Sequence, residues 1–503
     1  MYNSARDNGQ TSFIGFNATC GVQLDTENEW VKAADALPWH DIEDRLADDF
    51  GQTLGRPGIS IRKVVGVMMI QKKKNLTDRP VLKEIAENPY LQYFIGNNNF
   101  VPEAPFCQST LSKYRKLLPL KTIIEINNLY LLKLPESVKP CKDTDRVGAK
   151  SDEPVTDPDK NAGIMIEDAT CSPSNIKYPQ DFQILNDVRL YLEKVIDSFH
   201  TKYHPWDKPR TYRKIAKSVH LKLAKSKKRT QKQIRAVIKK ELGFIRRDLD
   251  YIDKYMAEGY AMSDQRQIAR YLTAIEIYKQ QLYMYRNNTH EVANRIVSLD
   301  QPFIRPIVRG KSKAPVEFGA KYDVTIDEKG HARLEYISFD AYNEGTILTD
   351  RIEAFKERTG HYPEAVMVDA IYRTKENIAY CKKRNIRITG KPLGNKKKFP
   401  KMTKEEKQIE YKDSVVRIAV ERFFSLIKLH YGAGLIMPRK SNSTINSIAL
   451  SILVANLFAT LPKGTTMHFF LEETLESTNI TFILFRAKDN VLNNQKNMSE
   501  NAV

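Results

Sequence analysis

The order of apolar patterns between about residues 162 and 432 constrains the fold of this chain more than any other feature. A short apolar run at 164–166 has the pattern of a buried strand, and an acid, Asp168, follows it. Helical spacing then continues over about 181–288, and at Val316 the period changes to the alternation expected of strands. We therefore expect one strand, a long helical segment and then a return to strands.

The elements after this helical segment complete the pattern. FGAKYDVTID and HARLEYISF are expected to form a hairpin, followed by the helix ILTDRIEAFKERTG, the strand EAVMVDA, the helix KENIAYCKKRN and the strand IRITG. A basic loop, GNKKKFPKMTKEEKQ, leads into a last helix, SVVRIAVERFFSLIKLHYG. Without the helical segment the order is β-β-β-α-β-α-β-α, which is that of a ribonuclease-H-like core. We expect an α/β core with a mixed five-stranded sheet.

The remaining boundaries follow from composition and from helix signals. Residues 1–135 are predicted to form an N-terminal all-α domain, and the polar, Pro- and Asp-rich residues 136–160 a linker. The core is expected at 161–440, with its helical insertion at about 177–315, and a C-terminal helix and polar tail at 441–503. Within the insertion, two apolar seams are predicted, one of Phe182, Leu185, Leu192, Val195 and Phe199, the other of Ile268, Leu272, Ile275, Tyr278 and Leu282.

Positive charge is concentrated in the insertion. Between Lys202 and Arg247 there are 17 lysines and arginines but two acids, which accounts for most of the formal net charge of +19. Such a block favours binding to a polyanion, a nucleic acid or an acidic membrane surface, although it is also compatible with a solvated helix face. Nearby aromatic residues (Tyr203, Trp206 and Tyr212) favour nucleic acid. The candidate DNA contacts are Lys227, Lys228, Arg229, Lys232 and Arg235.

Several other classes of protein are disfavoured. The apolar stretch from Ile445 to Leu461 has 17 residues and is interrupted by Asn and Ser, so we expect a buried helix and no membrane span. The first residues lack the pattern of a secretory signal, and the five cysteines form no C-x-x-C pair, which suits a reducing cytoplasm. Neither phosphate-binding glycine motif is present, so no nucleotide cofactor is expected.

Three acids take strategic positions in the expected core: Asp168 after the first strand, Asp369 after the fourth and Glu421 on the last helix. In a ribonuclease-H-like sheet these elements are neighbours, so the carboxylates can converge and hold two Mg²⁺ ions, for which Mn²⁺ can substitute. The alternative is that each acid caps a helix or is solvated. Other acids of similar local appearance are Glu167, Asp187, Glu344 and Glu376.

Arg417 and Lys428 accompany Glu421 on one face of the last helix, at offsets of four and seven residues. A carboxylate that holds metal between two cations suits a helix lying along a DNA backbone, because the cations neutralise phosphates. The alternative is an ordinary ion pair between residues one helical turn apart, Arg417 and Glu421.

The Arg-x3-Glu-x6-Lys spacing, followed by YGAGLI, resembles the signature of DDE transposases of bacterial insertion sequences, families four and five and their relatives. The resemblance covers about residues 30–460 and extends through GRPGISIRKVVGVMMIQKKKNLTDRPVLKEIAENPYLQYFIG, PFCQSTLSKYRKLL, IEDATCSPSNIKYPQDFQILNDVR and HYPEAVMVDAIYRTKENIAYCKKR. It implies that Asp168, Asp369 and Glu421 are the catalytic and metal-binding triad, while Ser414 replaces the tyrosine of the family signature.

The same resemblance implies a function. It predicts a metal-dependent DNA transposase that cleaves element ends and joins them to target DNA, acts as a homodimer in the DNA complex, and is cytoplasmic and associated with the nucleoid. The N-terminal helices would bind the DNA ends or form the dimer, although core packing explains their apolar faces equally well. A metal-dependent nuclease, or an inactive or non-catalytic DNA-binding relative, are the alternatives.

Overall fold

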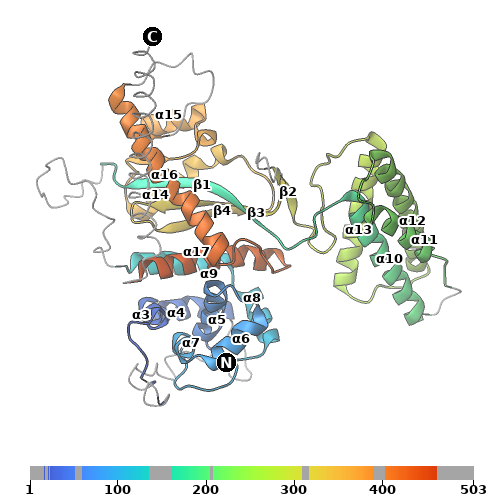
Figure 1. The fold of residues 1–503 in the computed structure, drawn as a ribbon, viewed down its shortest axis with the longest axis horizontal. Helices are drawn as coiled ribbons and strands as arrows, with labels where there is room; N and C mark the ends of the chain where they lie inside the picture. The colour runs from blue at the N-terminus through green and yellow to red at the C-terminus, as the bar shows by residue number, and fades with distance from the viewer. Residues whose placement is uncertain are drawn as a thin grey trace, which may run out of the picture.

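The computed structural model describes residues 23–50, 59–134, 160–203, 208–308, 316–389 and 403–461, together with Phe16 and Gly21. The expected linker at 136–160, except for its last residue, and all but the first part of the expected C-terminal region lie outside the described residues, as does Trp206. Figure 1 shows three parts of the molecule: a sheet with its helices, a group of N-terminal helices beneath it, and a helical insertion at one side.

The described N-terminal residues form helices only. Asn28 and Ser60 begin two of them, because each side chain accepts a hydrogen bond from a backbone N–H of the first turn, and Pro89 begins a third. The helices are α3 (Glu29–Ala36), α4 (Trp39–Phe50), α5 (Ile61–Lys73), α6 (Asp78–Glu87), α7 (Pro89–Phe94), α8 (Gln108–Leu117) and α9 (Leu120–Leu132).

The sheet has six strands where the sequence predicted five. The five expected strands are present: β1 (Ile164–Pro173), β3 (Val316–Asp327), β4 (Ala332–Ser338), β5 (Ala365–Met367) and β6 (Arg387–Ile388). The additional strand, β2 (Arg305–Val308), lies inside the segment that was expected to be helical and pairs antiparallel with β3. The order is β2-β3-β1-β5-β6, with β4 also paired to β3. Strand β1 is central, antiparallel to β3 and parallel to β5.

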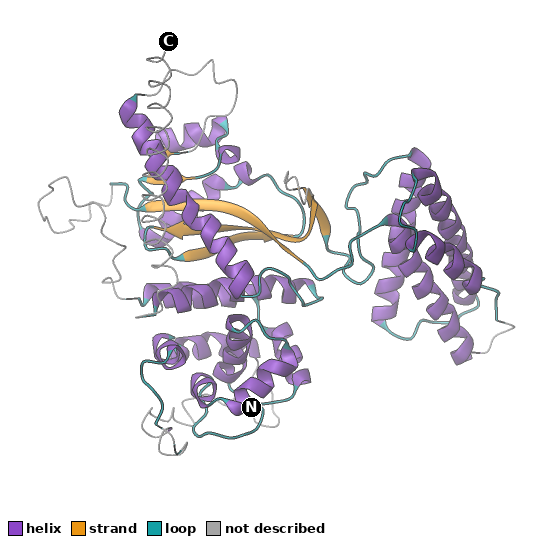
Figure 2. Ribbon diagram, viewed as in Figure 1, coloured by secondary structure: helices purple, strands orange, loops and turns teal. Residues whose placement is uncertain are grey.

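Helices cover both faces of this sheet. One face, which includes Met165 and Val366, packs against α14 (Leu348–Thr359) and α15 (Lys375–Lys383). The other face packs against α16 (Lys404–His430) and α17 (Ser441–Thr460), and Figure 2 shows α16 crossing the strands. Two 3₁₀ turns, η1 (Glu344–Thr346) and η2 (Ala370–Tyr372), lie beside the first of these faces.

Helix α16 begins earlier than the sequence indicated. The segment TKEEKQ was expected to be part of a loop, but α16 starts at Lys404. A capping box explains the difference, because the Thr403 side chain accepts from the backbone of Glu406 while the Glu406 side chain accepts from the backbone of Thr403.

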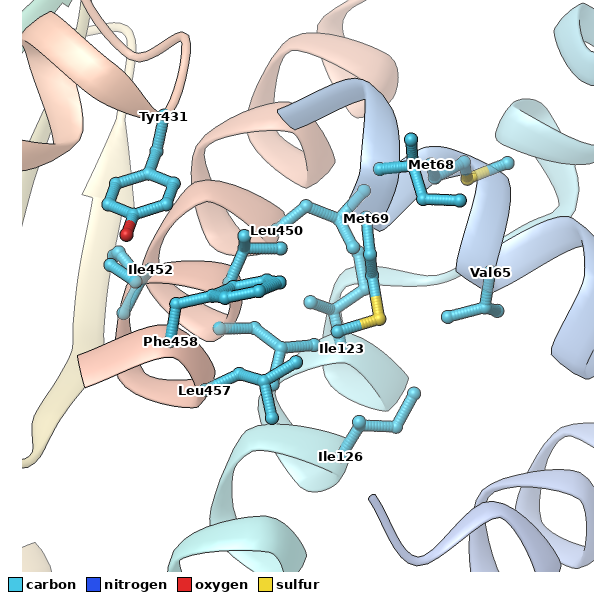
Figure 3. Packing of buried hydrophobic residues seen from close by; sticks show 14 of the residues in the cluster. Val65, Met68, Met69, Ile123, Ile126, Tyr431, Leu450, Ile452, Leu457 and Phe458 are labelled. Carbon is cyan, nitrogen blue, oxygen red and sulfur yellow. The ribbon is translucent and has the colours of Figure 1, made fainter. Parts of the chain in front are cut away.

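The N-terminal helices, α17 and one face of the sheet share a single hydrophobic core. Figure 3 shows residues of α5 and α9, including Met69 and Ile123, packed against residues of α17, including Leu457 and Phe458. The apolar stretch expected to be a buried helix is α17. It is the one helix in the described part of the chain that is apolar and long enough to span a membrane, but 83% of its most apolar window is buried, so no membrane protein is indicated.

The helical insertion has a hydrophobic core of its own, formed by α10 (Asp181–Tyr203), α12 (Gln231–Ala257) and α13 (Gln265–Asn287), with α11 (Arg213–Ala224) against α12. The predicted seam on α10 is buried. The predicted seam on α13 was right only in part: Ile275, Tyr278 and Leu282 are partly buried and pack against this core, but Ile268 and Leu272 are exposed. Tyr271, Ala274 and Ile277 are the more deeply buried residues. The apolar residues of α13 are spread around the helix, so its periodicity did not identify the buried face.

Candidate active site

The pairing of β1 with β5 brings Asp168 and Asp369 to neighbouring positions. Ile166 pairs with Met367 in the parallel register, so the residues two positions further along, Asp168 and Asp369, come level at the end of the pairing. Each carboxylate accepts a hydrogen bond from the backbone N–H of the residue that follows it, at 2.8 Å and 2.6 Å respectively. Asp369 is exposed at the start of η2, whereas the Asp168 side chain is only 18% exposed.

Helix α16 brings the third acid to the same strand, together with a cation that lies between the carboxylates. The guanidinium of Arg417 is 2.9 Å from Oε1 of Glu421 and 4.0 Å from Oδ2 of Asp168. The ion pair between Arg417 and Glu421, which was the alternative reading of the sequence, is therefore present. Arg417 also approaches Asp168 on β1. The Glu421 side chain is half exposed, so one side of this arrangement is open to solvent.

Lys428 is the second point at which α16 contacts β1. Its Nζ donates a hydrogen bond of 2.8 Å to Oγ1 of Thr170, two residues after Asp168 on the same face of the strand. Arg417 and Lys428 thus project from α16 toward the strand that carries Asp168. The shared helix face predicted from the sequence is directed at β1.

The electrostatic environment of Asp168 favours a cation. Burial raises the pKa of Asp168 to about 6; the negative charges of Glu344 and Asp369 add to this rise, and the Ala169 N–H and Arg417 oppose it. A carboxyl whose negative form is disfavoured by burial and by neighbouring acids gains from a nearby positive charge. In the described arrangement Arg417 supplies that charge.

The donor chemistry of these residues suits a hard divalent cation, because all three contribute carboxylate oxygens. Within the described ranges, however, no three acidic, histidine or cysteine side chains lie close enough together to form a metal centre. The structure brings Asp168 and Glu421 together through Arg417 and places Asp369 within electrostatic range of Asp168. The sequence placed Asp168 after the first strand, but β1 continues to Pro173, so Asp168 lies in the middle of β1, just past its pairing with β5. The three acids are thus placed around this middle part of the strand.

A second group of acids lies on the opposite face of β1; the sequence singled out Glu167 and Glu344 but not Asp323, and it did not predict that the three lie close together. Glu167 and Asp323 are fully buried, and burial raises the pKa of Asp323 to about 7 and that of Glu167 well above its ordinary value. Asp323 accepts a hydrogen bond of 3.1 Å from the Tyr372 hydroxyl. Glu344, which forms an ion pair of 2.7 Å with Lys321, adds negative charge near both Asp168 and Asp323. The alternation of polar and apolar residues in GAKYDVTID was the available signal.

The candidate DNA contacts of the basic block fall into two groups. Lys227, Lys228 and Lys232 are exposed at the connection between α11 and α12 and in the first turn of α12. Arg229 and Arg235 are exposed too, but they also form hydrogen bonds within the insertion: Arg229 donates to Gln180 and to the carbonyl of Ala224, and Arg235 donates to Asn288 and to the carbonyl of Tyr285. The two arginines therefore hold parts of the insertion together.

The mixed sheet with helices on both faces fits an α/β nuclease-like transposase fold. Comparison with known families agrees. Residues 366–458, from β5 to α17, match the family model described as "Transposase DDE domain", and residues 20–117 match "Transposase domain (DUF772)". The chain is therefore similar to transposase domains over both ranges, and the resemblance to DDE transposases is confirmed. The first match includes Asp369 and Glu421, and Asp168 precedes it.

One curated relative is the "Uncharacterized protein ORF8 in nfe locus" of Rhizobium meliloti. It is 29% identical over 189 residues, which are 37% of this chain and 79% of the relative. No solved structure matches the chain. The matched domains support a transposase function, and DNA is the substrate that the family implies.

Proposed function

We propose that this protein is a DNA transposase in which Asp168, Asp369 and Glu421 form the catalytic triad of a ribonuclease-H-like core. The observation that carries the proposal is the contact of α16 with β1, where Arg417 lies between Asp168 and Glu421 and where the strand register brings Asp369 level with Asp168. The strand order supports this core, since without β2 it is β4-β3-β1-β5-β6, with the first three antiparallel.

The three carboxylates would hold divalent metal, Mg²⁺ or Mn²⁺, which supplies activation of the attacking oxygen and neutralisation of charge on the phosphoryl group. In the reaction, a water oxygen forms a bond to phosphorus while the bond from phosphorus to the 3′ oxygen breaks, leaving a 3′-OH and a 5′-phosphate. The freed 3′-OH then attacks a phosphodiester of target DNA in the same way.

The cations of this chain have separate tasks in that reaction. Arg417 is close enough to two of the acids to reduce their mutual repulsion while DNA is absent. Lys428, held beside β1 by Thr170, presents an ammonium near the reacting phosphate, where a charge-assisted hydrogen bond stabilises binding. The exposed lysines of the insertion would add contacts to the DNA backbone that are independent of sequence.

The test uses the full-length protein, Mg²⁺ and a labelled duplex that carries the ends of its own element. Asp168→Asn, Asp369→Asn and Glu421→Gln should each abolish cleavage and joining while DNA binding persists. Glu410→Gln is the matched control, because Glu410 lies three turns before Glu421 on the same helix. Normal cutting by any of the three variants would remove that residue from the triad.

Two further measurements separate the related functions. Mn²⁺ should support the reaction and Ca²⁺ should support binding alone, since its looser coordination tolerates poor alignment of the reacting oxygens. Cleavage without joining would identify a metal-dependent nuclease instead, and binding without cleavage an inactive relative. Light scattering on the DNA complex should give the mass of a dimer.

A further inference from the structure

A cavity of about 580 Å³ lies where α5, α6 and α8 meet the loop after α16 and the start of α17. About half of its lining is apolar, and the polar half includes Lys72, Asn75, Asp78, Arg79, Arg115 and Ser447. The loop that forms one wall also contains Ile436, which pairs with Ser174 just after β1. The loop wall of the cavity is therefore paired to the chain just past the end of β1, and the size of the cavity is in the range of small-ligand sites.

Lys72 is an ammonium without a carboxylate partner among the ion pairs of the described residues. Its Nζ donates to Oγ of Ser447 at 2.5 Å, whereas the next two lysines of the sequence, Lys73 and Lys74, form ion pairs with acids. Burial, together with the nearby charge of Arg115, lowers the pKa of Lys72 to about 7. An ammonium donates three hydrogen bonds, so two remain for a ligand.

The one carboxylate that lines the cavity is already bound to another cation. Asp78 accepts hydrogen bonds of 2.7 Å and 3.2 Å from Arg115, which also donates to Gln71 at 3.1 Å. Arg79 lines the cavity as well, and its side chain is exposed. The lining therefore contains three cationic side chains, those of Lys72, Arg79 and Arg115, and one acid, Asp78. A bound anion would balance this excess of positive charge.

The loop that contains Gly432 passes close to the ammonium of Lys72. Gly432 lies at a φ of +69°, and a Cβ at this position would be 3.2 Å from Oδ1 of Asn75 and 3.6 Å from Nζ of Lys72. Gly432 ends the α16 segment, so the absence of a side chain allows the loop to pass close to Lys72. The position of the ammonium is therefore fixed by two parts of the chain that are far apart in sequence.

We propose that this cavity binds one phosphate group of a DNA backbone, with Lys72 as the direct contact and Arg79 at the rim. The inference rests on the proposed function, which requires DNA, and adds a contact outside the candidate active site. A phosphate oxygen accepts strong charge-assisted hydrogen bonds from lysine and arginine, and its negative charge offsets the cost of burying Lys72. Free phosphate has the same chemistry, so the test must distinguish the two sources.

The test compares Lys72→Met and Arg79→Gln with Lys83→Met, a control on α6 whose side chain is 76% exposed and pairs with Glu87. DNA affinity of the full-length protein is measured at several salt concentrations. Lys72→Met should weaken binding roughly tenfold or more and reduce the slope of log K against log salt by about 0.9, the value for one phosphate contact. Phosphate-ethylation interference should lose one position, and Lys83→Met should match wild type.

Thermal unfolding at pH 6 distinguishes a binding lysine from a structural one. Because the folded pKa of Lys72 is below its unfolded value, its charged form costs stability at pH 6, and that cost diminishes as pH rises from about 7. Lys72→Met should therefore unfold at or above the wild-type temperature. A clear drop in unfolding temperature would make Lys72 a structural residue and overturn the inference, and Arg79→Gln, at an exposed position, tests the cavity independently of folding.

Inorganic phosphate separates the two sources. We expect it to bind the wild-type protein only at millimolar concentration, and not to bind Lys72→Met. Micromolar binding of phosphate, with DNA binding unchanged in Lys72→Met, would assign the cavity to free phosphate and overturn the DNA contact. Normal cleavage with unchanged salt slopes in both variants would overturn this inference alone. A wild-type protein that binds no DNA would overturn the proposed function as well.

Discussion

The molecule has two groups of helices that differ in what their apolar faces contact. The N-terminal helices share one hydrophobic core with α17 and with the sheet face that includes Ile166 and Tyr322. The insertion, α10–α13, has its own core and joins the rest of the chain through the segments after β1 and before β2. Helical content alone therefore does not identify a domain. The helices of the insertion bury their apolar faces against one another, whereas the N-terminal helices bury theirs against α17 and the sheet as well.

A buried polar cluster of a different kind lies in each core. In the shared core, the neutral amides of Asn127 and Asn456 bond to each other and to the backbone of Ala332, which connects α9, α17 and β4. In the insertion, Arg189 forms buried ion pairs with Glu193 and Glu241. We therefore expect the cluster of the insertion to respond to pH and the amide cluster to be insensitive to it.

The largest expected effect compares one phenylalanine in each core. Phe458 packs edge-to-face on Trp30 at 5.0 Å, and Phe199 stacks on Tyr255 at 5.1 Å; both phenylalanines are 2% exposed. Phe458→Ala and Phe199→Ala should each cost about 3–5 kcal/mol, from reduced burial and the cavity left behind. In hydrogen exchange, Phe458→Ala should deprotect the N-terminal helices and the sheet together, and Phe199→Ala only α10–α13. Deprotection of the sheet by Phe199→Ala would contradict separate cores.

The next effect is specific to the insertion and depends on pH. Arg189→Met leaves Glu241 buried without its cation, and breaking such a pair costs about 3–5 kcal/mol. Burial already raises the pKa of Glu241 to about 7, above its unfolded value, so the folded state binds the additional proton and stability falls as pH rises from about 4.5 to 7. The loss in Arg189→Met should be larger at pH 8 than at pH 5. Denaturant unfolding monitored at both pH values measures it, and an equal loss would argue against ionised Glu241.

The sequence predicted the strands better than it predicted their surroundings. Five strands were found from apolar runs and alternation, whereas β2 has four residues and contains Pro306, which weakens the strand signal. That β1 and β5 are neighbours follows from element order, but the register that brings Asp168 level with Asp369 comes from the structure. The position of Arg417 between two acids does not, because it depends on how closely α16 approaches β1. The hydrogen bond of Arg229 was not predicted for the same reason, since its partner Gln180 is distant in sequence.

A smaller effect is expected for Lys428, which contacts Thr170 on β1, and it tests whether this lysine alters the rate of cleavage. Lys428→Ala should slow single-turnover cleavage, with a loss on the order of 1.5–3 kcal/mol, or roughly ten- to a hundredfold, if the ammonium contacts phosphate. Thr170→Val is the matched control, because it removes the hydroxyl that Lys428 contacts and keeps the charge. Equal loss of cleavage in both variants would reduce Lys428 to a packing residue. Lys428→Arg should restore the rate only in part, since a guanidinium holds phosphate differently.

The smallest effects are expected in the basic block. There we expect some residues to affect DNA binding and their neighbours to affect stability. Replacing Lys227, Lys228 and Lys232 together by Gln should weaken binding to specific and random DNA equally, because backbone contacts carry no sequence information. The salt slope should fall by about 0.9 for each phosphate that a lysine no longer neutralises, while stability should change by no more than about 0.5 kcal/mol, since all three are exposed.

The matched control is Arg235→Ala on the same helix as Lys232. Because its guanidinium donates to Asn288 and to the carbonyl of Tyr285, its removal should cost about 1 kcal/mol of insertion stability with a smaller change in DNA affinity. Filter binding at several salt concentrations and thermal unfolding would be measured on both proteins. If the lysine variant kept the wild-type salt slope, these lysines would be a solvated surface, and the insertion would have to contact DNA elsewhere or not at all.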